Sequence, residues 1–283
     1  MEPENIREQP VENDRTADDG PPAPVATTAP WLPSPPQVHR YKGPDEVAAA
    51  AAKLFLDSAK RAVDQADRCL VVLAGGSTPR SLYRLLAESP YRENVPWPKM
   101  FFVFGDERCV PPDHEDSNYG MVRETLFDPL EIPAHNVLRM KGEQVPAEAA
   151  RRYQVRIGDL FLSHPKRQFD LVLLGIGADG HTASLFPDTK ALDEQERWVV
   201  ANEVPQLGAW RLTLTFPALN AAKKVVFLAT GERKAQVIAE AFGGVEHAEP
   251  HPCERVAPRA RCEVLIDEAA ASLIPASPEI RGD

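Results

Sequence analysis

An apolar run that breaks into a glycine-rich turn constrains the fold of this chain more than any other feature. Residues 171–174 are four consecutive leucine and valine residues, which is typical of a strand buried on both faces of a parallel sheet. The following G-I-G-A-D-G-H contains three glycines, which permit backbone conformations closed to other residues. The turn is therefore expected to present Asp179 and His181 at the carboxyl end of the strand, where ligands bind in open α/β sheets.

Similar apolar runs alternate with helical patterns along most of the chain. This alternation predicts a doubly wound, mostly parallel, Rossmann-like α/β sheet with helices on both faces. The expected strands are 38–41, 69–74, 100–104, 169–174, 198–201, 211–215, 225–229 and 263–266, and the expected helices are 44–67, 79–88, 117–127, 146–162, 232–242 and 267–273.

Composition sets the limits of the domain. Residues 1–36 are rich in proline and acidic residues and are predicted to be a disordered tail, followed by a catalytic domain over 37–275 and a short tail at 276–283. The formal net charge of -10 argues against a nucleic-acid partner. No apolar run approaches the roughly 20 residues that span a bilayer. The oligomeric state is left open, with a monomer as the default.

The four cysteines lack the spacing of a zinc site or a disulfide framework. We interpret them as free thiols, which predicts a cytoplasmic protein. Neither a metal nor a cofactor is expected at the site.

Two further strand ends carry polar residues. Gly75, Gly76, Ser77 and Thr78 precede Pro79 at the start of a helix, where unpaired amides bind phosphate, although an ordinary strand-to-helix turn capped by Ser77 or Thr78 fits equally.

After the next strand come Asp106 and Arg108. They form either a surface ion pair or a site in which Arg108 holds phosphate and Asp106 orients a histidine or binds a sugar hydroxyl. The acidic loop around His114 is more typical of solvated residues than of a metal site.

His181 is the candidate catalytic base, because an imidazole with an ordinary pKa of about 6.5 accepts a proton near neutral pH. The run G-I-G-A-D-G also has the spacing of a dinucleotide-binding turn, but Pro187 follows too soon for the required helix, so NAD binding is rejected. Two cations complete the candidate set. Arg211 lies in an expected strand, and Lys234 lies in the first turn of an expected helix, where it is either indifferent or shares an anion with the helix terminus.

Taken together, these motifs resemble the 6-phosphogluconolactonase family, within the glucosamine-6-phosphate isomerase/lactonase superfamily, over roughly residues 40–275. The run D-G-H-T-A-S-L-F-P is the most specific match. The deaminases of the superfamily are similar up to D-G-H and continue differently. The resemblance departs at 204–210, which lacks the lysine often seen before the arginine, and the fold that it implies is the NagB/RpiA/CoA-transferase-like one.

The resemblance implies hydrolysis of 6-phosphoglucono-1,5-lactone, the second step of the oxidative pentose phosphate pathway. His181 would activate water, and Asp106 or Asp179 would orient the imidazole or bind a hydroxyl. Amides around Gly177–Gly180 or a cationic side chain would stabilise the oxyanion. Two alternatives remain: an amino-sugar-phosphate deaminase/isomerase, and a non-catalytic sugar-phosphate sensor. The phosphate would be held by the amides of Gly76, Ser77 and Thr78, with Arg108, Lys234 and Arg211.

Overall fold

The computed structural model describes residues 35–162, 168–258 and 261–274. The predicted tails at 1–36 and 276–283 therefore lie almost entirely outside the described residues, and the domain limits stay a prediction. No helix in the described ranges is long and apolar enough to cross a membrane.

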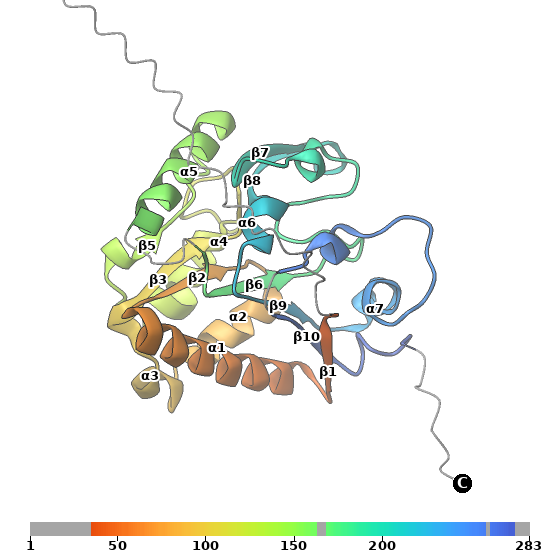
Figure 1. Cartoon of the computed structure of the whole chain (residues 1–283), viewed down its shortest axis with the longest axis horizontal. Helices are drawn as coiled ribbons and strands as arrows, with labels where there is room; N and C mark the ends of the chain where they lie inside the picture. The colour runs from red at the N-terminus through yellow and green to blue at the C-terminus, as the bar shows by residue number, and fades with distance from the viewer. Residues whose placement is uncertain (1–34, 163–167, 259–260, 275–283) are drawn as a thin grey trace, which may run out of the picture.

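Seven parallel strands form the central sheet, as the alternation of strands and helices predicts (Figure 1). Their order is β1-β10-β9-β6-β2-β3-β5. The strands are β1 (Gln37–Tyr41), β2 (Cys69–Leu73), β3 (Met100–Phe104), β5 (Val137–Leu138), β6 (Leu171–Gly175), β9 (Lys224–Ala229) and β10 (Arg261–Asp267).

The chain folds from β2 outward to β3 and β5, and then from β6 outward to β9 and β10. Direction therefore reverses between the neighbouring strands β2 and β6, where the loops after two adjacent strands turn to opposite faces. Such a switch point opens a crevice at the carboxyl edge of a sheet. The two loops that border it are the glycine-rich segments after β2 and β6.

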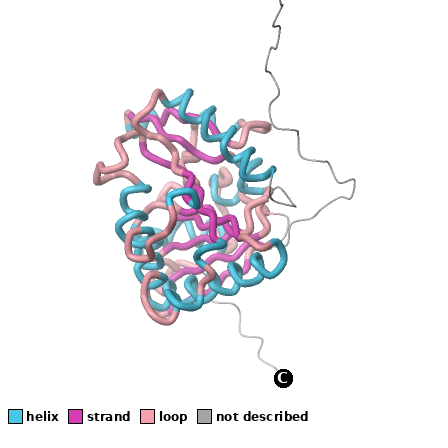
Figure 2. Tube along the Cα trace, turned by 90° about the vertical axis from the view of Figure 1, so that its left-hand side faces the viewer, coloured by secondary structure: helices cyan, strands magenta, loops and turns pink. Residues whose placement is uncertain are grey.

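Helices cover both faces of this sheet (Figure 2). In Figure 1, α1 runs along one side and α5 lies on the other, beside β7 and β8. Both helices have the bounds that periodicity predicts to within a residue. The helices are α1 (Pro44–Ala66), α2 (Ser77–Leu86), α3 (Tyr91–Asn94), α4 (Asn118–Val122), α5 (Pro146–Leu162), α6 (Phe216–Asn220) and α7 (Ala235–Phe242).

A second, antiparallel sheet departs from the sequence prediction. It has the order β4-β8-β7, with β4 (Asp106–Arg108), β7 (Val199–Val204) and β8 (Ala209–Leu214). The strands expected near 198–201 and 211–215 exist, but they pair with each other and with β4 rather than with the parallel sheet. β4 was not among the expected strands.

Three expected helices also differ from the structure. Residues 268–274 form turns rather than a helix after β10. The helix expected over 117–127 is α4 followed by a π-helical turn, Arg123–Phe127. The helix expected over 232–242 begins as a 3-10 turn, Glu232–Lys234, before α7.

Candidate active site

Four predicted motifs follow four adjacent strands of the central sheet. The strand order β9-β6-β2-β3 places the segments that begin at Thr230, Ile176, Ala74 and Gly105 side by side at the carboxyl edge. Polar groups from distant parts of the chain thus border one crevice at the switch point. This arrangement is what the separate motifs predict if they serve one ligand.

His181 is held by a carboxylate two residues before it. Its Nδ1 lies 2.6 Å from Oδ1 of Asp179, which also accepts the backbone N–H of His181 at 3.2 Å. The imidazole also stacks on the ring of Phe186, at a centroid distance of 4.0 Å, which restricts the orientation of the ring. With Nδ1–H donated to Asp179, the Nε2 lone pair is the one left to accept a proton.

The pKa of Asp179 is lowered. Partial burial acts in the opposite direction and raises it, but the hydrogen bonds and the charge of His181 together outweigh burial. The carboxylate therefore stays ionised near neutral pH and keeps its role as acceptor of the Nδ1 proton.

Glycines in the loop allow the side chains of His181 and Asp179 to pack closely against the loop backbone. An added Cβ at Gly177 would lie 2.1 Å from Nδ1 of His181, so the imidazole would have to move. The Gly177 N–H donates to the carbonyl of His181 at 2.8 Å, and the Gly180 N–H donates to the carbonyl of Gly177 at 3.1 Å. Gly180 has a φ of +78°, which only glycine adopts readily.

Asp106 does not contact His181. Its buried carboxylate accepts the hydroxyl of Ser184 at 2.6 Å and the side-chain amide of Asn118 at 3.2 Å. Of the two acidic residues proposed to orient the imidazole, Asp179 therefore has the required contact. Asp106 instead ties β4 to the segment that follows His181.

The helix after Gly75 and Gly76 begins without the expected cap. Gly76 is the N-cap with a φ of +103°, and no side chain caps α2, so the prediction that Ser77 or Thr78 does so is wrong. The Thr78 hydroxyl instead lies 2.8 Å from that of Thr230, joining the loops after β2 and β9. The first-turn amides of α2 are thus left without a side-chain acceptor, as an anion-binding helix terminus requires.

Arg108 and Arg211 face each other across β4 and β8. Like charges directly opposite in a sheet destabilise it unless an anion lies between them. Burial and then the charge of Arg108 lower the pKa of Arg211. Arg108 donates to the carbonyl of Asp116 at 2.7 Å. Both arginines line a pocket of about 650 Å³, and neither has a hydrogen bond to His181 among the described residues.

Lys234 interacts electrostatically with Asp179. Burial lowers the pKa of its ammonium group, whereas the charge of Asp179 raises it. The side chain is half-buried at the start of the helical segment after β9. A partly desolvated cation attracts an anionic ligand more strongly than a fully solvated cation does.

Sequence reasoning missed the role of Glu107. This buried carboxylate accepts the backbone N–H groups of Arg108, Asn118 and Tyr119 and the hydroxyl of Ser117. Burial raises its pKa despite these donors. It anchors the start of α4 and thereby places Asn118 against Gly75, where an added Cβ would lie 1.8 Å from Oδ1. The only signal in the sequence was its position between two site residues.

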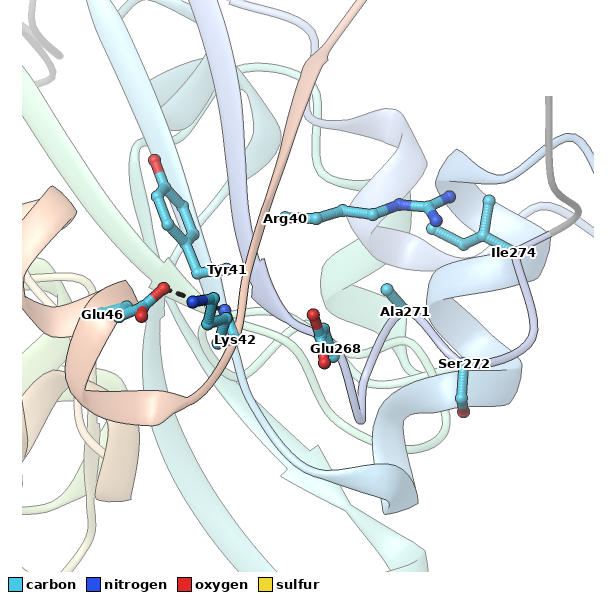
Figure 3. A pocket seen from close by; sticks show the side chains of 8 residues that line it. All are labelled: Arg40, Tyr41, Lys42, Glu46, Glu268, Ala271, Ser272 and Ile274. Atoms are coloured by element: carbon cyan, nitrogen blue, oxygen red, sulfur yellow. Dashed lines mark hydrogen bonds between the residues drawn. The ribbon is translucent and has the colours of Figure 1, made fainter. Parts of the chain in front are cut away.

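Another pocket lies away from these groups. It has a volume of about 550 Å³ and lies at the edge of the sheet, between the end of β1, the start of α1 and the turns that follow β10 (Figure 3). None of the predicted site residues is among its lining residues, which are Arg40, Tyr41, Lys42, Glu46, Glu268, Ala271, Ser272 and Ile274.

Comparison with known proteins places the chain in a family. The sequence pattern described as glucosamine-6-phosphate isomerases/6-phosphogluconolactonase matches residues 42–265. This chain belongs to that family. A 6-phosphogluconolactonase of Haemophilus influenzae is 38% identical over 205 residues, covering 72% of this chain and 87% of the relative. The human 6-phosphogluconolactonase is 37% identical over 247 residues, covering 86% and 95%.

The fold agrees with the same family. The solved structure of 6-phosphogluconolactonase from Trypanosoma cruzi superposes with a TM-score of 0.76 at 29% identity, covering 87% of this chain and 99% of that one. The doubly wound α/β prediction is thus confirmed both by the sheet order and by the isomerase/lactonase family fold. The family name covers isomerases as well as lactonases, and the relatives compared here carry the lactonase name.

Proposed function

We propose that this chain is a 6-phosphogluconolactonase that hydrolyses 6-phospho-D-glucono-1,5-lactone to 6-phospho-D-gluconate in the oxidative pentose phosphate pathway. The relatives of the same name, which align over most of the chain, support the reaction. The observation that carries the chemistry is the 2.6 Å pair of His181 and Asp179 at the carboxyl end of β6.

His181 acts as the general base. Its Nε2 takes a proton from water as the water oxygen attacks the lactone carbonyl carbon, C1. The tetrahedral intermediate then collapses as the bond from C1 to the ring oxygen breaks, and Nε2 returns its proton to that oxygen. Asp179 holds the Nδ1 proton and stabilises the imidazolium between the two steps.

The amides of Gly177 and Gly180 already donate within the loop. Of the two options that the sequence left open, we therefore favour a cationic side chain over these two amides. We assign this role to Lys234, the cation whose charge acts on Asp179. A positive charge in a partly desolvated position stabilises a developing anion more than it stabilises the neutral lactone.

The phosphate binds between the start of α2 and the two arginines of the antiparallel sheet. The first-turn amides of Ser77 and Thr78 have no capping side chain, and the facing pair Arg108 and Arg211 has no acidic partner within ion-pair distance among the described residues. A phosphate dianion would relieve the repulsion between the arginines and accept bidentate hydrogen bonds from them.

The test generates the lactone in situ and follows its disappearance above the spontaneous rate. The His181→Ala variant should lose about 10²- to 10⁴-fold in kcat while keeping its fold, because it removes the general base. His135→Ala, a change in an exposed histidine, is the matched control and should retain the wild-type rate. Near wild-type turnover in His181→Ala would exclude the mechanism. Release of ammonia from glucosamine 6-phosphate, without lactone hydrolysis, would instead favour the deaminase.

A cytoplasmic location belongs to the same proposal. All four cysteines are unpaired, and three of them are buried, as expected where thiols stay reduced.

A further inference from the structure

A second cluster of titratable side chains lies behind the loop that carries His181. His247, His251 and Glu254 come from the segment after α7 and the 3-10 turn Pro252–Arg255. One ligand atom from each lies within 4.8 Å of the other two. The proposed lactonase mechanism uses none of them.

We propose that His247, His251 and Glu254 bind a divalent transition-metal ion, with Zn²⁺ as the preferred ion. Two imidazole nitrogens and one carboxylate oxygen form the three-ligand set that zinc accepts in proteins, with water in the fourth position. Imidazole suits Zn²⁺, whereas Mg²⁺ and Ca²⁺ prefer sites made of oxygen alone.

His247 is already oriented as a ligand. Its Nδ1 lies 3.2 Å from the carbonyl of Val245, and its Nε2 lies 2.9 Å from Oε2 of Glu254. A ligating histidine usually donates its second N–H to a carbonyl or carboxylate in this way. The separation of 2.9 Å is close to the roughly 3.3 Å between neighbouring ligand atoms that a tetrahedral ion with bonds of about 2.0 Å implies. A metal ion thus replaces the proton that His247 and Glu254 share.

His251 has the carboxylate partner that orients metal-binding histidines. Its Nε2 lies 2.7 Å from Oε2 of Glu240 on α7, which leaves Nδ1 as the ligand. Its side chain now accepts the backbone N–H of Glu254, and metal binding replaces that hydrogen bond. The ring is nearly parallel to that of His247, at 13° and a centroid distance of 5.0 Å, so the two imidazoles must rotate for their lone pairs to meet at one ion.

The site is adjacent to the catalytic loop. An added Cβ at Gly180 would lie 2.5 Å from Nδ1 of His251, and the backbone N–H of Cys253 donates to the carbonyl of Gly180 at 3.0 Å. A metal that fixes His251 therefore also fixes the backbone immediately before His181. The ion holds this loop in position and takes no part in the proposed hydrolysis.

Metal-free protein titrated with Zn²⁺ in a calorimeter tests the proposal, and Co²⁺ substitution adds a visible absorption spectrum that reports the coordination geometry. We expect one tight site in the wild type. His247→Ala and Glu254→Gln should each weaken binding at least tenfold and remove the cobalt spectrum. Both residues are only partly buried, so the variants are expected to fold.

Two control variants separate this cluster from other histidines. His114→Ala changes an exposed histidine in the acidic loop, and His181→Asn removes the imidazole of the catalytic pair. Both should bind Zn²⁺ with the wild-type affinity. The proposal is overturned if the wild type binds no zinc, if His247→Ala binds as the wild type does, or if His181→Asn or His114→Ala abolishes binding.

Discussion

His181 receives its position from residues close to it in the chain. Three residues within five positions of it determine its placement. Asp179 hydrogen-bonds its Nδ1, Gly177 leaves room for its ring, and Phe186 stacks on that ring. This local character is why the motif identified the candidate base from sequence. The stacking of Phe186 was not predicted, because it depends on a turn at Ala183, whose φ of +48° is unusual for a residue other than glycine.

At Asp179, the change to asparagine keeps the size of the side chain and removes its charge. We expect kcat to fall by roughly 10²-fold or more, because the imidazole loses the carboxylate that fixes its tautomer and stabilises its cation. Wild-type kcat in Asp179→Asn, measured with the same lactone assay, would show that Asp179 does not act on His181.

The lowered pKa of Asp179 has a matching effect on stability. A carboxylate with a depressed pKa in the folded state stabilises the fold above its unfolded pKa, and this contribution is lost as pH falls through the folded value. Urea unfolding of wild type and Asp179→Asn should therefore converge only at strongly acidic pH.

At Gly177, alanine should abolish most activity, because its Cβ would occupy space 2.1 Å from Nδ1 of His181. We expect kcat to fall far more than KM rises, since the proposed phosphate-binding groups lie outside this loop. Gly158→Ala is the control, because α5 leaves nothing within 4 Å of the added Cβ. That change should retain activity and stabilise the helix by about 0.5–1 kcal/mol. Equal kinetics in the two variants would contradict the proposed site geometry.

Among the elements, the small antiparallel sheet is the part that sequence did not predict. Alternation identified β8 and part of β7, but alternation does not say which sheet a strand joins. β4 is three polar residues long, and its partner β8 lies about a hundred residues later, so local pattern gave it no strand signal. The sheet nevertheless brings Arg108 opposite Arg211, a pairing that no spacing in the sequence indicates.

Helix ends show the same limit. Periodicity predicted α1 and α5 to within a residue, because their buried stripes are long. The segment after β10 has a similar pattern over a few residues and forms turns instead, since the carboxylate of Asp267 bonds the backbone of Gly231 and Ala270. Short segments follow such tertiary hydrogen bonds more than their own propensity.

Glu107 links β4 to the start of α4 through buried hydrogen bonds. Glutamine at this position would turn an N–H₂ group toward N–H and O–H donors, so we expect Glu107→Gln to lower the free energy of unfolding by about 1–3 kcal/mol. Because burial raises the pKa of Glu107, its contribution to stability is greatest below the unfolded pKa and declines as pH rises through the folded value. The gap between wild type and variant in urea unfolding should thus be wider near pH 4 than at pH 7. A gap that widens with rising pH would contradict this sign.

Across the whole molecule, sequence predicted the sheet type and the family, and the strand order explains why the motifs act together. The four loops follow β9, β6, β2 and β3, which are neighbours in space although their residues span more than 150 positions. Strand order depends on pairing between distant parts of the chain, which local sequence patterns do not reveal. That these loops lie side by side could therefore be established only from the topology of the sheet.

A ligand that bridges these loops should stabilise the whole domain. We expect 6-phosphogluconate at a hundred times its dissociation constant to add about 2.7 kcal/mol, which corresponds to roughly 5–10 °C in Tm for a domain of this size. At the same ligand concentration, Arg108→Ala should lose most of this shift, whereas His135→Ala should keep it. A full shift in Arg108→Ala, measured by differential scanning fluorimetry, would exclude Arg108 from the phosphate site.

The local contacts of His181 have a consequence for protein engineering. The proposed base, its carboxylate and the glycines beside them occupy one short segment, whereas the proposed phosphate-binding groups lie at the start of α2 and on the strands β4 and β8. The segment that carries His181 can therefore stay unchanged while the proposed phosphate-binding elements are varied toward other phosphorylated sugars. Random mutagenesis restricted to those elements would be the direct way to change the sugar that the site accepts without changing the segment that carries His181.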